Sequence, residues 1–333
     1  MAKGYAAKQP GGKLEVMEYD LGPLGDHQVA IKVEYCGICH SDLHMIDNDW
    51  GMSQYPLVPG HEIIGTIEAV GSHVKGLKVG QYVGVGWSSG SCMSCEWCLS
   101  GNHNLCPSNI PTVLGRYGGF ADKLYVQAEW VLPLPSALKH EAAGPLLCGG
   151  ITVFNPLMQF NVKPTDRVGV IGIGGLGHMA IKFLDAWGCE VTAFSSNPAK
   201  ESEAKKLGAD HFVNSLDTNA LAKVANSLDF IISTVDSPLD WNSYLTALRP
   251  KGRLHHVGAL LQPMQVSVFP GLINQKSISA SPTGSPGAMA TMLEFAARHN
   301  IHPTVEIFKF SEVNEAIEKL KNGKIRYRAV LKH

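Results

Sequence analysis

The chain has 333 residues, an apolar fraction of 45%, a charged fraction of 17% and a net charge of −1 at pH 7. This length predicts two domains rather than a single core. A net charge near zero excludes the basic surfaces that bind nucleic acid or anionic membranes. The most apolar stretch, residues 169–187, is broken by five glycines, His178 and Lys182, so it predicts no membrane span.

No apolar stretch that could serve as a secretory signal peptide follows the N-terminal residues Met1–Tyr5, and we therefore expect a cytoplasmic protein. In that compartment the eight cysteines are expected to be metal ligands or free thiols rather than disulfides. Six of the eight fall into two sets described below. Cys36 and Cys189 lie outside those sets, and we interpret both as ordinary buried thiols.

The first half of the chain is predicted to be rich in β-strands. Short β-branched and aromatic runs at 29–34, 63–70 and 124–126 are separated by glycine or proline. Residues 131–135 are expected to form an extended connector, because their two prolines disfavour both a helix and a central strand.

After about residue 150 the pattern changes to alternating strands and helices. Strands are predicted at 167–172, 190–194, 229–234 and 252–257, with helices at 176–187 and 199–207. This alternation predicts a parallel, doubly wound sheet of the Rossmann type. The tail is expected to hold helices at 289–299 and 311–321, the second with Ser311 as its N-cap, and a final strand at 327–331.

Four cysteines form a compact set: Cys92, Cys95, Cys98 and Cys106. Four thiolates fill every position of a tetrahedral Zn²⁺, which predicts a structural zinc site. The two C-x-x-C pairs also allow redox chemistry. However, a dithiol couple gives no role to the other two thiols, so zinc is the better interpretation.

A second set of ligand residues is scattered: Cys39, His61 and Cys148. Three protein ligands leave one position of the ion open, which is the arrangement of a catalytic zinc. A single cysteine or histidine is more often a packed core residue than a ligand. The interpretation therefore depends on the motifs around each of them.

A glycine-rich turn lies between a predicted strand and a predicted helix, and its residues are Gly172, Gly174, Gly175, Leu176 and Gly177. In this context the glycines permit a tight turn, let the backbone approach a pyrophosphate, and allow close packing of helix on sheet. The helix N-terminus adds amide donors. The alternative is a turn that only connects the two elements.

The end of the next strand predicts which dinucleotide binds. An NAD-binding protein usually has an acidic residue there, which binds the 2′-hydroxyl of the ribose. Here Ser195, Ser196 and Asn197 offer hydroxyl and amide donors, and Lys200 adds a positive charge. The absence of a carboxylate favours NADP(H), although a loop with no role in selectivity is the alternative.

Taken together, these motifs resemble the zinc-dependent medium-chain alcohol dehydrogenases. The resemblance is carried by Cys39-His-Ser-Asp42, Gly60-His-Glu62, the four-cysteine set and the glycine-rich turn. Residues 36–42, 55–62 and 195–198 are more similar to the cinnamyl-alcohol-dehydrogenase branch, and within it to bacterial NADPH-dependent aldehyde reductases of broad range.

The resemblance implies a GroES-like catalytic domain at residues 1–149 and 286–333, interrupted by an NADP-binding Rossmann domain at 150–285. It implies that each chain holds two Zn²⁺ ions, with the scattered set binding the catalytic one. Glu62 resembles a residue that approaches or transiently replaces a ligand. Asp42 resembles the carboxylate that orients the ligand histidine from behind.

The resemblance also implies a mechanism in which an aldehyde is polarised by the zinc and receives a hydride from NADPH. A proton would then travel from His44 through the cofactor ribose and Ser41. A helix N-cap is the alternative role for Ser41, and a solvated side chain the alternative for His44. Further cofactor contacts are implied for Thr152, Thr234, Val257, Gly258 and Arg328, the last through the pyrophosphate. Trp50, Trp87 and Leu114 are the expected apolar lining of the substrate pocket.

Two rival functions follow from the same residues. One is an NAD-linked alcohol dehydrogenase that works in the oxidation direction. The other is a non-catalytic homologue that binds zinc and nucleotide, although such a protein is expected to have lost the ligands of an open site. Between residues 106 and 119 the chain is shorter than the plant lignin enzymes and lacks a tryptophan, which argues against a cinnamyl substrate. Family members suggest a homodimer, with a tetramer as the alternative.

Overall fold

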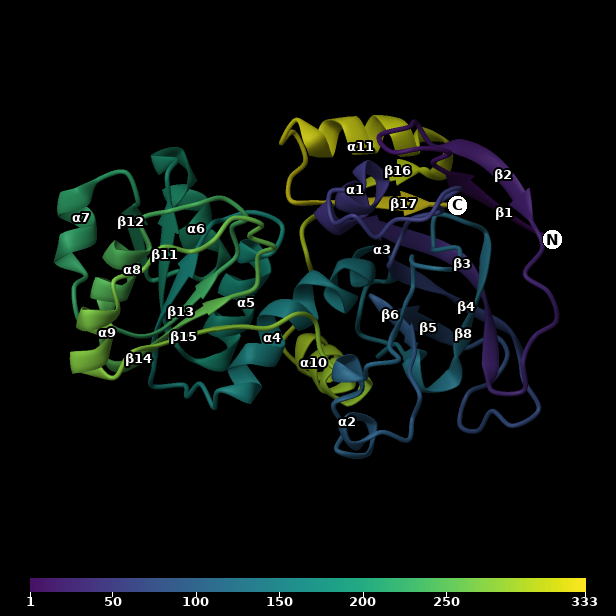
Figure 1. Cartoon of the computed structure of the whole chain (residues 1–333), viewed down its shortest axis with the longest axis horizontal. Coiled ribbons are helices and arrows are strands. Elements are labelled where there is room, and N and C mark those ends of the chain that lie inside the picture. The colour runs from purple at the N-terminus through teal and green to yellow at the C-terminus, as the bar shows by residue number, and fades with distance from the viewer. The chain divides into compact units, whose positions relative to one another are not determined.

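The computed structural model describes all 333 residues and divides them into two compact units. The first unit comprises Met1–Ile151 and Thr283–His333, and the second comprises Thr152–Pro282. Figure 1 shows both units along the chain. The domain boundaries expected from the sequence, at 149/150 and 285/286, lie within a few residues of the divisions between the two units, at 151/152 and 282/283.

The first unit is built on a seven-stranded sheet in the order β16-β17-β3-β4-β5-β9, with β8 paired to β3. Its strands are β3 (Gln28–Ile38), β4 (Glu62–Val70), β5 (Tyr82–Val85), β8 (Lys123–Gln127), β9 (Leu132–Pro133), β16 (Val305–Lys309) and β17 (Arg328–Lys332). The last two strands bring the tail of the chain into the same sheet, because β17 pairs antiparallel with β3. Two small sheets complete the unit, one of β1 (Ala2–Ala6) and β2 (Glu15–Tyr19), the other of β6 (Ser88–Gly90) and β7 (Ile110–Pro111).

The helices of this unit are short, and most of them follow a strand of the sheet. They are α1 (His40–Asp47), α2 (Glu96–Leu99), α3 (His140–Ala143), α10 (Pro286–Arg298) and α11 (Val313–Lys321). Four 3₁₀ turns accompany them: η1 (His103–Leu105), η2 (Ala128–Trp130), η3 (Gly144–Leu147) and η5 (Phe310–Glu312). Helix α4 (Gly149–Gln159) begins in the first unit and ends in the second.

The second unit holds a six-stranded sheet in the order β12-β11-β10-β13-β14-β15, with every neighbouring pair parallel. Its strands are β10 (Arg167–Ile171), β11 (Glu190–Ser195), β12 (His211–Asn214), β13 (Leu228–Ser233), β14 (Leu248–His256) and β15 (Ser277–Ala280). Its helices are α5 (Gly177–Trp187), α6 (Glu201–Leu207), α7 (Thr218–Lys223), α8 (Trp241–Ala247) and α9 (Val268–Asn274), with a 3₁₀ turn η4 (Pro198–Lys200). This confirms the predicted doubly wound parallel sheet.

Helices cover both faces of this parallel sheet, with α8 and α9 on one side and α4 and α5 on the other (Figure 1). On the α8 side, Phe194 and Leu254 pack with Trp241 and Tyr244 in a buried apolar cluster. The rings of Phe194 and Tyr244 meet edge to face with centroids 5.5 Å apart. Because both faces are covered, the strands are apolar runs rather than alternating ones.

One buried polar group joins two strands of the parallel sheet. The imidazole of His255 on β14 is fully buried and lies 2.9 Å from the Ser279 hydroxyl through Nδ1 and 2.9 Å from the Ser281 hydroxyl through Nε2. Burial lowers the pKa of His255 to about 4, because the charged form is poorly solvated there, and Arg253 and His256 add to the effect. The ring is therefore neutral near pH 7 and bonds to both hydroxyls.

One local expectation is wrong. Ser311 is not an N-cap, because η5 precedes α11 and the Lys309 N–H donates instead to the Glu312 carboxylate at 2.8 Å. The segment 131–135 is neither a helix nor a central strand, as predicted, and it contains only the short edge strand β9, where Pro133 is tolerated. Cys36 and Cys189 are both buried, as predicted.

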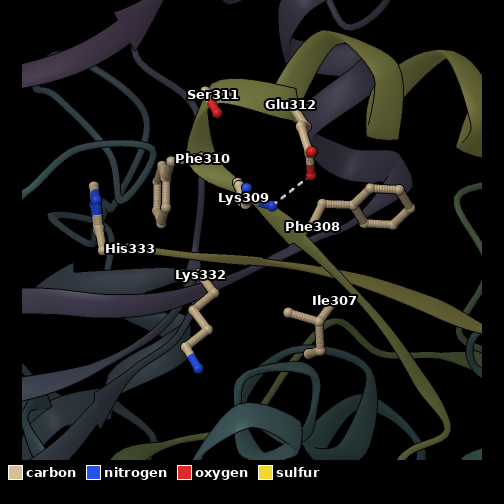
Figure 2. Close-up of a pocket in the computed structure, with 8 residues that line it drawn as sticks. All are labelled: Ile307, Phe308, Lys309, Phe310, Ser311, Glu312, Lys332 and His333. Atoms are coloured by element: carbon tan, nitrogen blue, oxygen red, sulfur yellow. Dashed lines mark hydrogen bonds between the residues drawn. The ribbon is translucent and has the colours of Figure 1, made fainter.

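A hollow of about 670 Å³ lies where β16 and β17 end, and Figure 2 shows its lining side chains. The ring of His333 stacks on Phe310 with centroids 3.6 Å apart and an interplanar angle of 10°. Lys309 and Lys332 are neighbours in the parallel register of the two strands. None of the predicted site residues lines this hollow. No helix of the chain has the length and apolar character needed to cross a membrane.

Candidate functional site

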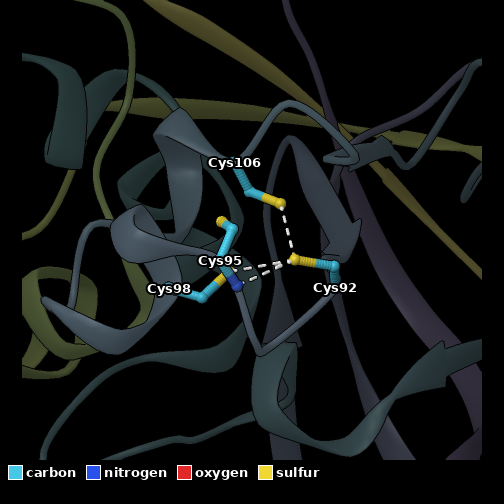
Figure 3. A group of neighbouring side chains, drawn as sticks. All are labelled: Cys92, Cys95, Cys98 and Cys106. Carbon is cyan, nitrogen blue, oxygen red and sulfur yellow. Dashed lines mark hydrogen bonds between the residues drawn. The ribbon is translucent and has the colours of Figure 1, made fainter.

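The four cysteines of the compact set converge in a small lobe after β6, as Figure 3 shows. Their sulfur atoms all lie within 4.8 Å of one another, with Cys106 3.5 Å and Cys98 4.0 Å from the sulfur of Cys92. Zinc–sulfur bonds of 2.3 Å in a tetrahedron place sulfurs about 3.8 Å apart, whereas a disulfide needs about 2.05 Å. All four thiols are free. This spacing fits the ligands of a zinc ion, and no disulfide is formed among the four thiols.

The backbone of the lobe also favours thiolate ligands. Backbone N–H groups of Ser94 and Cys95 donate to the Cys92 sulfur and lower the pKa of Cys92 to about 6. A thiolate, rather than a thiol, is the form that binds metal. The backbone therefore favours the thiolate form at Cys92, whereas burial and the hydrogen bonds with the other thiols raise the pKa of Cys95 to about 11.

The scattered set converges in the first unit as well. Ligand atoms of Cys39, His61, Glu62 and Cys148 all lie within 4.8 Å of one another. The Nε2 of His61 lies 3.2 Å from the Cys148 sulfur, and the sulfurs of Cys39 and Cys148 are 3.9 Å apart. Cys148 is the one member of the group that is not fully buried. The set therefore has one side that a small molecule can approach.

Asp42 fixes the orientation of this set from within α1. Its carboxylate is fully buried and lies 2.9 Å from His61 Nδ1, while it accepts hydrogen bonds of 2.9 Å from the Cys39 and Gly60 N–H groups. With Nδ1 bonded to Asp42, the Nε2 of His61 is directed at the two thiols. Burial disfavours the charged ring, but the negative charge of Asp42 and its hydrogen bond raise the pKa of His61 well above its usual value.

Glu62 and Arg328 form a buried ion pair beside the thiols. The Arg328 guanidinium donates to Oε1 of Glu62, and its Nη1 lies 4.0 Å from the Cys39 sulfur. The Oε2 atom of Glu62 is buried and has no hydrogen-bond partner. Burial raises the pKa of Glu62, although Arg328 opposes this. The sequence placed Arg328 at the cofactor pyrophosphate, whereas the partner that the structure gives it is Glu62.

The two thiols of the scattered set differ in acidity. The Cys148 thiol donates to Cys39, which together with the charge of Arg328 holds the pKa of Cys39 well below its usual range. The same hydrogen bond and burial raise the pKa of Cys148 well above its usual range. Cys39 is therefore the more acidic of the two thiols.

Ser41 and His44 lie on α1, next to the metal-ligand group. Cys39 is the N-cap of α1, so the alternative role of Ser41 as N-cap is wrong. The Ser41 hydroxyl lies 3.7 Å from the Cys39 sulfur. Further along the helix, His44 Nδ1 lies 2.7 Å from the Asp49 carboxylate, and the His44 side chain is 21% exposed.

Sequence reasoning missed Asp49. The helix ends at Asn48 in the left-handed conformation, with φ +59°, and this turn brings Asp49 back beside His44. A carboxylate just past the end of a helix that carries a candidate relay histidine is a signal that the sequence offered. The contact orients the imidazole, and it leaves Nε2 available for proton exchange.

Two tryptophans connect the ligand histidine with the relay histidine. Trp87 meets His61 edge to face with centroids 5.0 Å apart, and Trp50 lies 6.0 Å from Trp87. Trp50 in turn stacks on His44 at 5.2 Å. Of the three expected pocket residues, Trp87 therefore contacts the ligand His61, Trp50 lies between Trp87 and His44, and Leu114 is half-buried on the loop after β7.

The glycine-rich turn joins β10 to α5 in the second unit. Gly172 has φ +87°, which favours glycine, and a Cβ on Gly177 would lie 1.8 Å from the Gly172 carbonyl oxygen. A Cβ on Gly174 would meet no atom within 4 Å. The protein's own backbone therefore requires glycine at positions 172 and 177. At Gly174 the missing side chain instead leaves open space beside the turn. The turn also includes Gly175 and Leu176, immediately before the N-terminus of α5.

The expected selectivity residues follow β11. Ser195 is buried, and its hydroxyl oxygen accepts a 3.2 Å hydrogen bond from the Asn197 N–H. Ser196 and Asn197 are exposed. Lys200 turns back towards the glycine-rich turn, where its Nζ donates to the Ile173 carbonyl at 2.6 Å.

The other expected cofactor residues of the second unit lie at the ends of neighbouring strands. Thr234 donates to the Ile171 carbonyl at 2.9 Å, and the N–H groups of Val257 and Gly258 point to the Ser233 carbonyl. These residues therefore border the glycine-rich turn at the carboxyl end of the sheet, where ligands of such folds bind. Thr152 is buried on α4.

Comparison with known proteins places this chain in a family. Residues 25–136 match the alcohol dehydrogenase GroES-like domain, and residues 175–298 match the zinc-binding dehydrogenase domain. The chain is 53% identical to the aldehyde reductase AdhA of Synechocystis sp. over 333 residues, which covers 100% of this chain and 99% of that protein. The chain belongs to the zinc-dependent medium-chain alcohol dehydrogenases.

Other members of this alcohol dehydrogenase family are similar over the same length. Vomilenine reductase of Rauvolfia serpentina is 42% identical, with 99% of this chain and 94% of that protein covered. A cinnamyl alcohol dehydrogenase of Sorghum bicolor superposes with a TM-score of 0.96 at 39% identity, covering 99% of this chain and 97% of that one. The enzyme of the same name from Helicobacter pylori, complexed with NADP(H), gives 0.91 at 32% identity, also covering 99% and 97%. The predicted family, branch and fold are thereby confirmed.

Proposed function

We propose that this alcohol dehydrogenase reduces aldehydes to primary alcohols with NADPH, and that it catalyses the reverse reaction as well. The observation that carries the proposal is the scattered set of ligands, in which two sulfurs and one imidazole nitrogen come together. Four sulfurs fill every position of a tetrahedral zinc, whereas these three ligands leave a coordination position for a substrate oxygen. Relatives named as an aldehyde reductase and as cinnamyl alcohol dehydrogenases support the same class of reaction.

The residues present fit a zinc ion at both groups, giving two ions per chain. Two sulfurs and an imidazole nitrogen are typical ligands of a catalytic zinc, and the unpartnered Oε2 of Glu62 offers a further oxygen close by. Four sulfurs are typical of a structural one. When bound, the catalytic ion supplies Lewis acidity to the aldehyde oxygen and NADPH supplies the hydride.

The chain's own residues would hold the site and move the proton. Asp42 orients His61, and the positive charge of Arg328 stabilises the buried carboxylate of Glu62. Ser41 is placed beside the ligand group to donate a proton to the product oxygen. His44 would replenish it from solvent, because it is partly exposed and held by Asp49.

Preference for NADP(H) is the finer part of the proposal. Residues 195–200 contain two hydroxyls, an amide and a lysine but no carboxylate, so a 2′-phosphate meets donors and no repulsion. The similar Helicobacter pylori enzyme was solved with NADP(H). Ser195 is central, because its position at the end of β11 is where NAD-binding proteins usually carry their acidic residue.

Initial rates with NADPH and NADH on straight-chain and aromatic aldehydes test this proposal. We expect aldehyde reduction with a clear preference for NADPH. In Ser195→Asp, kcat/KM with NADPH should fall by about 100-fold while that with NADH changes little, because a carboxylate repels the 2′-phosphate. Preference of the wild type for NADH would refute the cofactor assignment, and failure to reduce any aldehyde would refute the reaction.

We also propose that the enzyme is a homodimer formed through the second unit. Strand β15 is the last strand of its sheet and has one unpaired edge. Beside it, α9 exposes four large apolar side chains by 65–74%: Val268, Phe269, Leu272 and Ile273. A contiguous apolar patch next to a free strand edge fits pairing with a second copy.

The mass in solution tests this interface. Ile278→Lys places a charge on β15 itself, where Ile278 is 42% exposed, and it should shift the enzyme from dimer to monomer in analytical ultracentrifugation. Leu216→Lys is the matched control, since Leu216 is 74% exposed in the same unit but lies outside α9 and β15. An unchanged dimer in Ile278→Lys would refute the interface.

A further inference from the structure

The loop between β7 and β8 lies against two segments that border the scattered ligand set. At its start, the Thr112 N–H donates to the Trp87 carbonyl at 2.7 Å. At its end, the N–H groups of residues 118–120 donate to the carbonyls of residues 58–60, each at 2.8 Å. The ligand His61 follows directly, and the Trp87 ring contacts it. Both ends of the loop are therefore fixed against the ligand histidine and its aromatic neighbour.

The tip of this loop, residues 114–116, has little support from the backbone. The N–H groups of Gly115 and Arg116 donate to no backbone carbonyl, and that of Leu114 lies 3.4 Å from the Pro111 oxygen, a long hydrogen bond. Gly115 is exposed and has φ +67°. Leu114, an expected lining residue of the aldehyde pocket, therefore belongs to a segment that a side chain must hold in place.

Arg116 connects this tip to two strands of the first unit. Its Nη1 donates to the Ser89 hydroxyl at 2.8 Å, and its Nη2 donates to the Tyr125 carbonyl. Ser89 is buried on β6, two residues after Trp87, and Tyr125 lies on β8. The guanidinium presents both donors in one rigid plane. It therefore fixes the distance between the tip that carries Leu114 and the strand that follows Trp87.

This guanidinium is held at a cost in free energy. Both of its hydrogen-bond partners are neutral oxygens, and its Nε atom is buried without a partner. Burial lowers the pKa of Arg116 to about 10, because the charged form is poorly solvated there, although the nearby Tyr19 opposes this. An apolar side chain of similar volume would avoid that cost. Stability alone therefore does not account for an arginine at this position.

We propose that Arg116 is a positioning residue for aldehyde specificity, because it fixes Leu114 relative to Trp87 across the substrate pocket. The inference rests on the proposed function, including the two residues as pocket lining. With the tip held, the pocket has a fixed width that suits short aldehydes. With the tip released, Leu114 can withdraw, so a short aldehyde loses an apolar contact while a bulky one gains room.

The ratio of kcat/KM for butanal to that for 3-phenylpropanal, measured with the zinc-loaded enzyme, tests this role. Arg116→Met should lower the ratio about five- to tenfold, the value of one or two methylene groups removed from apolar contact. Arg116→Lys keeps the charge but not the planar fork, so it should lower the ratio less. Ser89→Ala should also lower it, and adding Ser89→Ala to Arg116→Met should change nothing further, because their shared hydrogen bond is already lost.

Lys123→Met is the matched control, because Lys123 also lies on β8 but pairs with Glu68 at the surface. It removes the same charge and should leave the ratio unchanged. An equal fall in kcat/KM for both aldehydes in Arg116→Met, or a lower melting temperature with an unchanged ratio, would show a structural role alone and refute the inference.

Hydrogen exchange of the peptide that spans residues 112–119 gives a readout without turnover. Exchange should be faster in Arg116→Met than in the wild type and unchanged in Lys123→Met, because only the first variant releases the tip. Equal exchange in Arg116→Met and the wild type would refute the anchoring. The failure of the proposed function is a different result, since it would appear as no aldehyde reduction by the wild type itself.

Discussion

Replacing Asp42 by asparagine should weaken binding of the catalytic zinc while leaving the shape of the site intact. The carboxylate accepts from the Cys39 and Gly60 N–H groups and bonds to His61 Nδ1, each at 2.9 Å. Asparagine has nearly the same volume but no charge, and its NH₂ group cannot accept a hydrogen bond. One N–H donor therefore loses its acceptor, and the ligand histidine loses the anion that fixes its tautomer and raises its basicity.

The size of the effect follows from this geometry. Removing the group that hydrogen-bonds a ligand histidine typically weakens metal binding by 10- to 100-fold, or about 1.4–2.7 kcal/mol. Asp42 is fully buried and makes three bonds, and losing a hydrogen bond to a buried charged group costs about 1.5–3 kcal/mol. We therefore expect the upper half of the range, a loss of about 30- to 100-fold at one of the two ions.

Competition with a colorimetric zinc chelator measures this loss for each ion in turn. The ion held by the four cysteines should be unaffected and serves as an internal reference. Asp47→Asn is the matched control, because Asp47 lies on the same helix and its ion pair with Lys321 is on the surface. Zinc affinity within twofold of wild type in Asp42→Asn, or an equal loss in Asp47→Asn, would refute the orienting role.

Three further predictions concern other parts of the chain. Asp49→Asn should lower kcat by about five- to tenfold, because the relay His44 loses the carboxylate 2.7 Å away that orients its ring; an unchanged kcat would exclude this route. His255→Gln should make the protein less sensitive to acid. The pKa of His255 is about 4 in the folded protein and about 6.5 in the unfolded chain, so the unfolded chain binds more protons as the pH falls from 7 to 4. This difference should cost the wild type about 2 kcal/mol of its free energy of unfolding between pH 7 and pH 5. Urea unfolding at pH 7 and pH 5 measures the free energy of unfolding of each protein. An equal loss in the wild type and in His255→Gln would contradict the prediction. Cys106→Ser should release the structural zinc and lower the melting temperature while the other ion stays bound; metal analysis would contradict this if both ions remained or both were lost.

Local patterns were sufficient to predict the elements that define the family. The alternation of strands and helices after residue 150 could be predicted from the periodicity of the apolar residues alone. The four-cysteine site could be predicted because the spacing of the cysteines in the sequence fits the ligands of one ion. The pairing of Asp42 with His61 came from the family rather than from any local signal, since 19 residues separate the two. Sequence reasoning thus reached the site mainly where its members are close together or match a motif.

The parts that failed depend on choices that propensity does not settle. Ser311 and Glu312 both satisfy a helix start, and the structure uses the Glu312 side chain with a 3₁₀ turn in place of a serine cap. The Asp49 contact depends on a left-handed residue at a helix end, and that of Lys200 on the packing of two loops. Such contacts arise from the folded backbone, so the sequence shows at most that a suitable residue type, such as Asp49 after the end of α1, is near.

Metal analysis of the wild type beside Cys148→Ser tests the central claim most directly. Cys148 lies just before α4, and it is one of the three residues expected to bind the catalytic zinc. The account predicts two zinc ions per chain in the wild type and about one in the variant, with aldehyde reduction lost and the circular dichroism spectrum unchanged. A variant that keeps both ions and its activity would contradict the assignment of a catalytic zinc to this site.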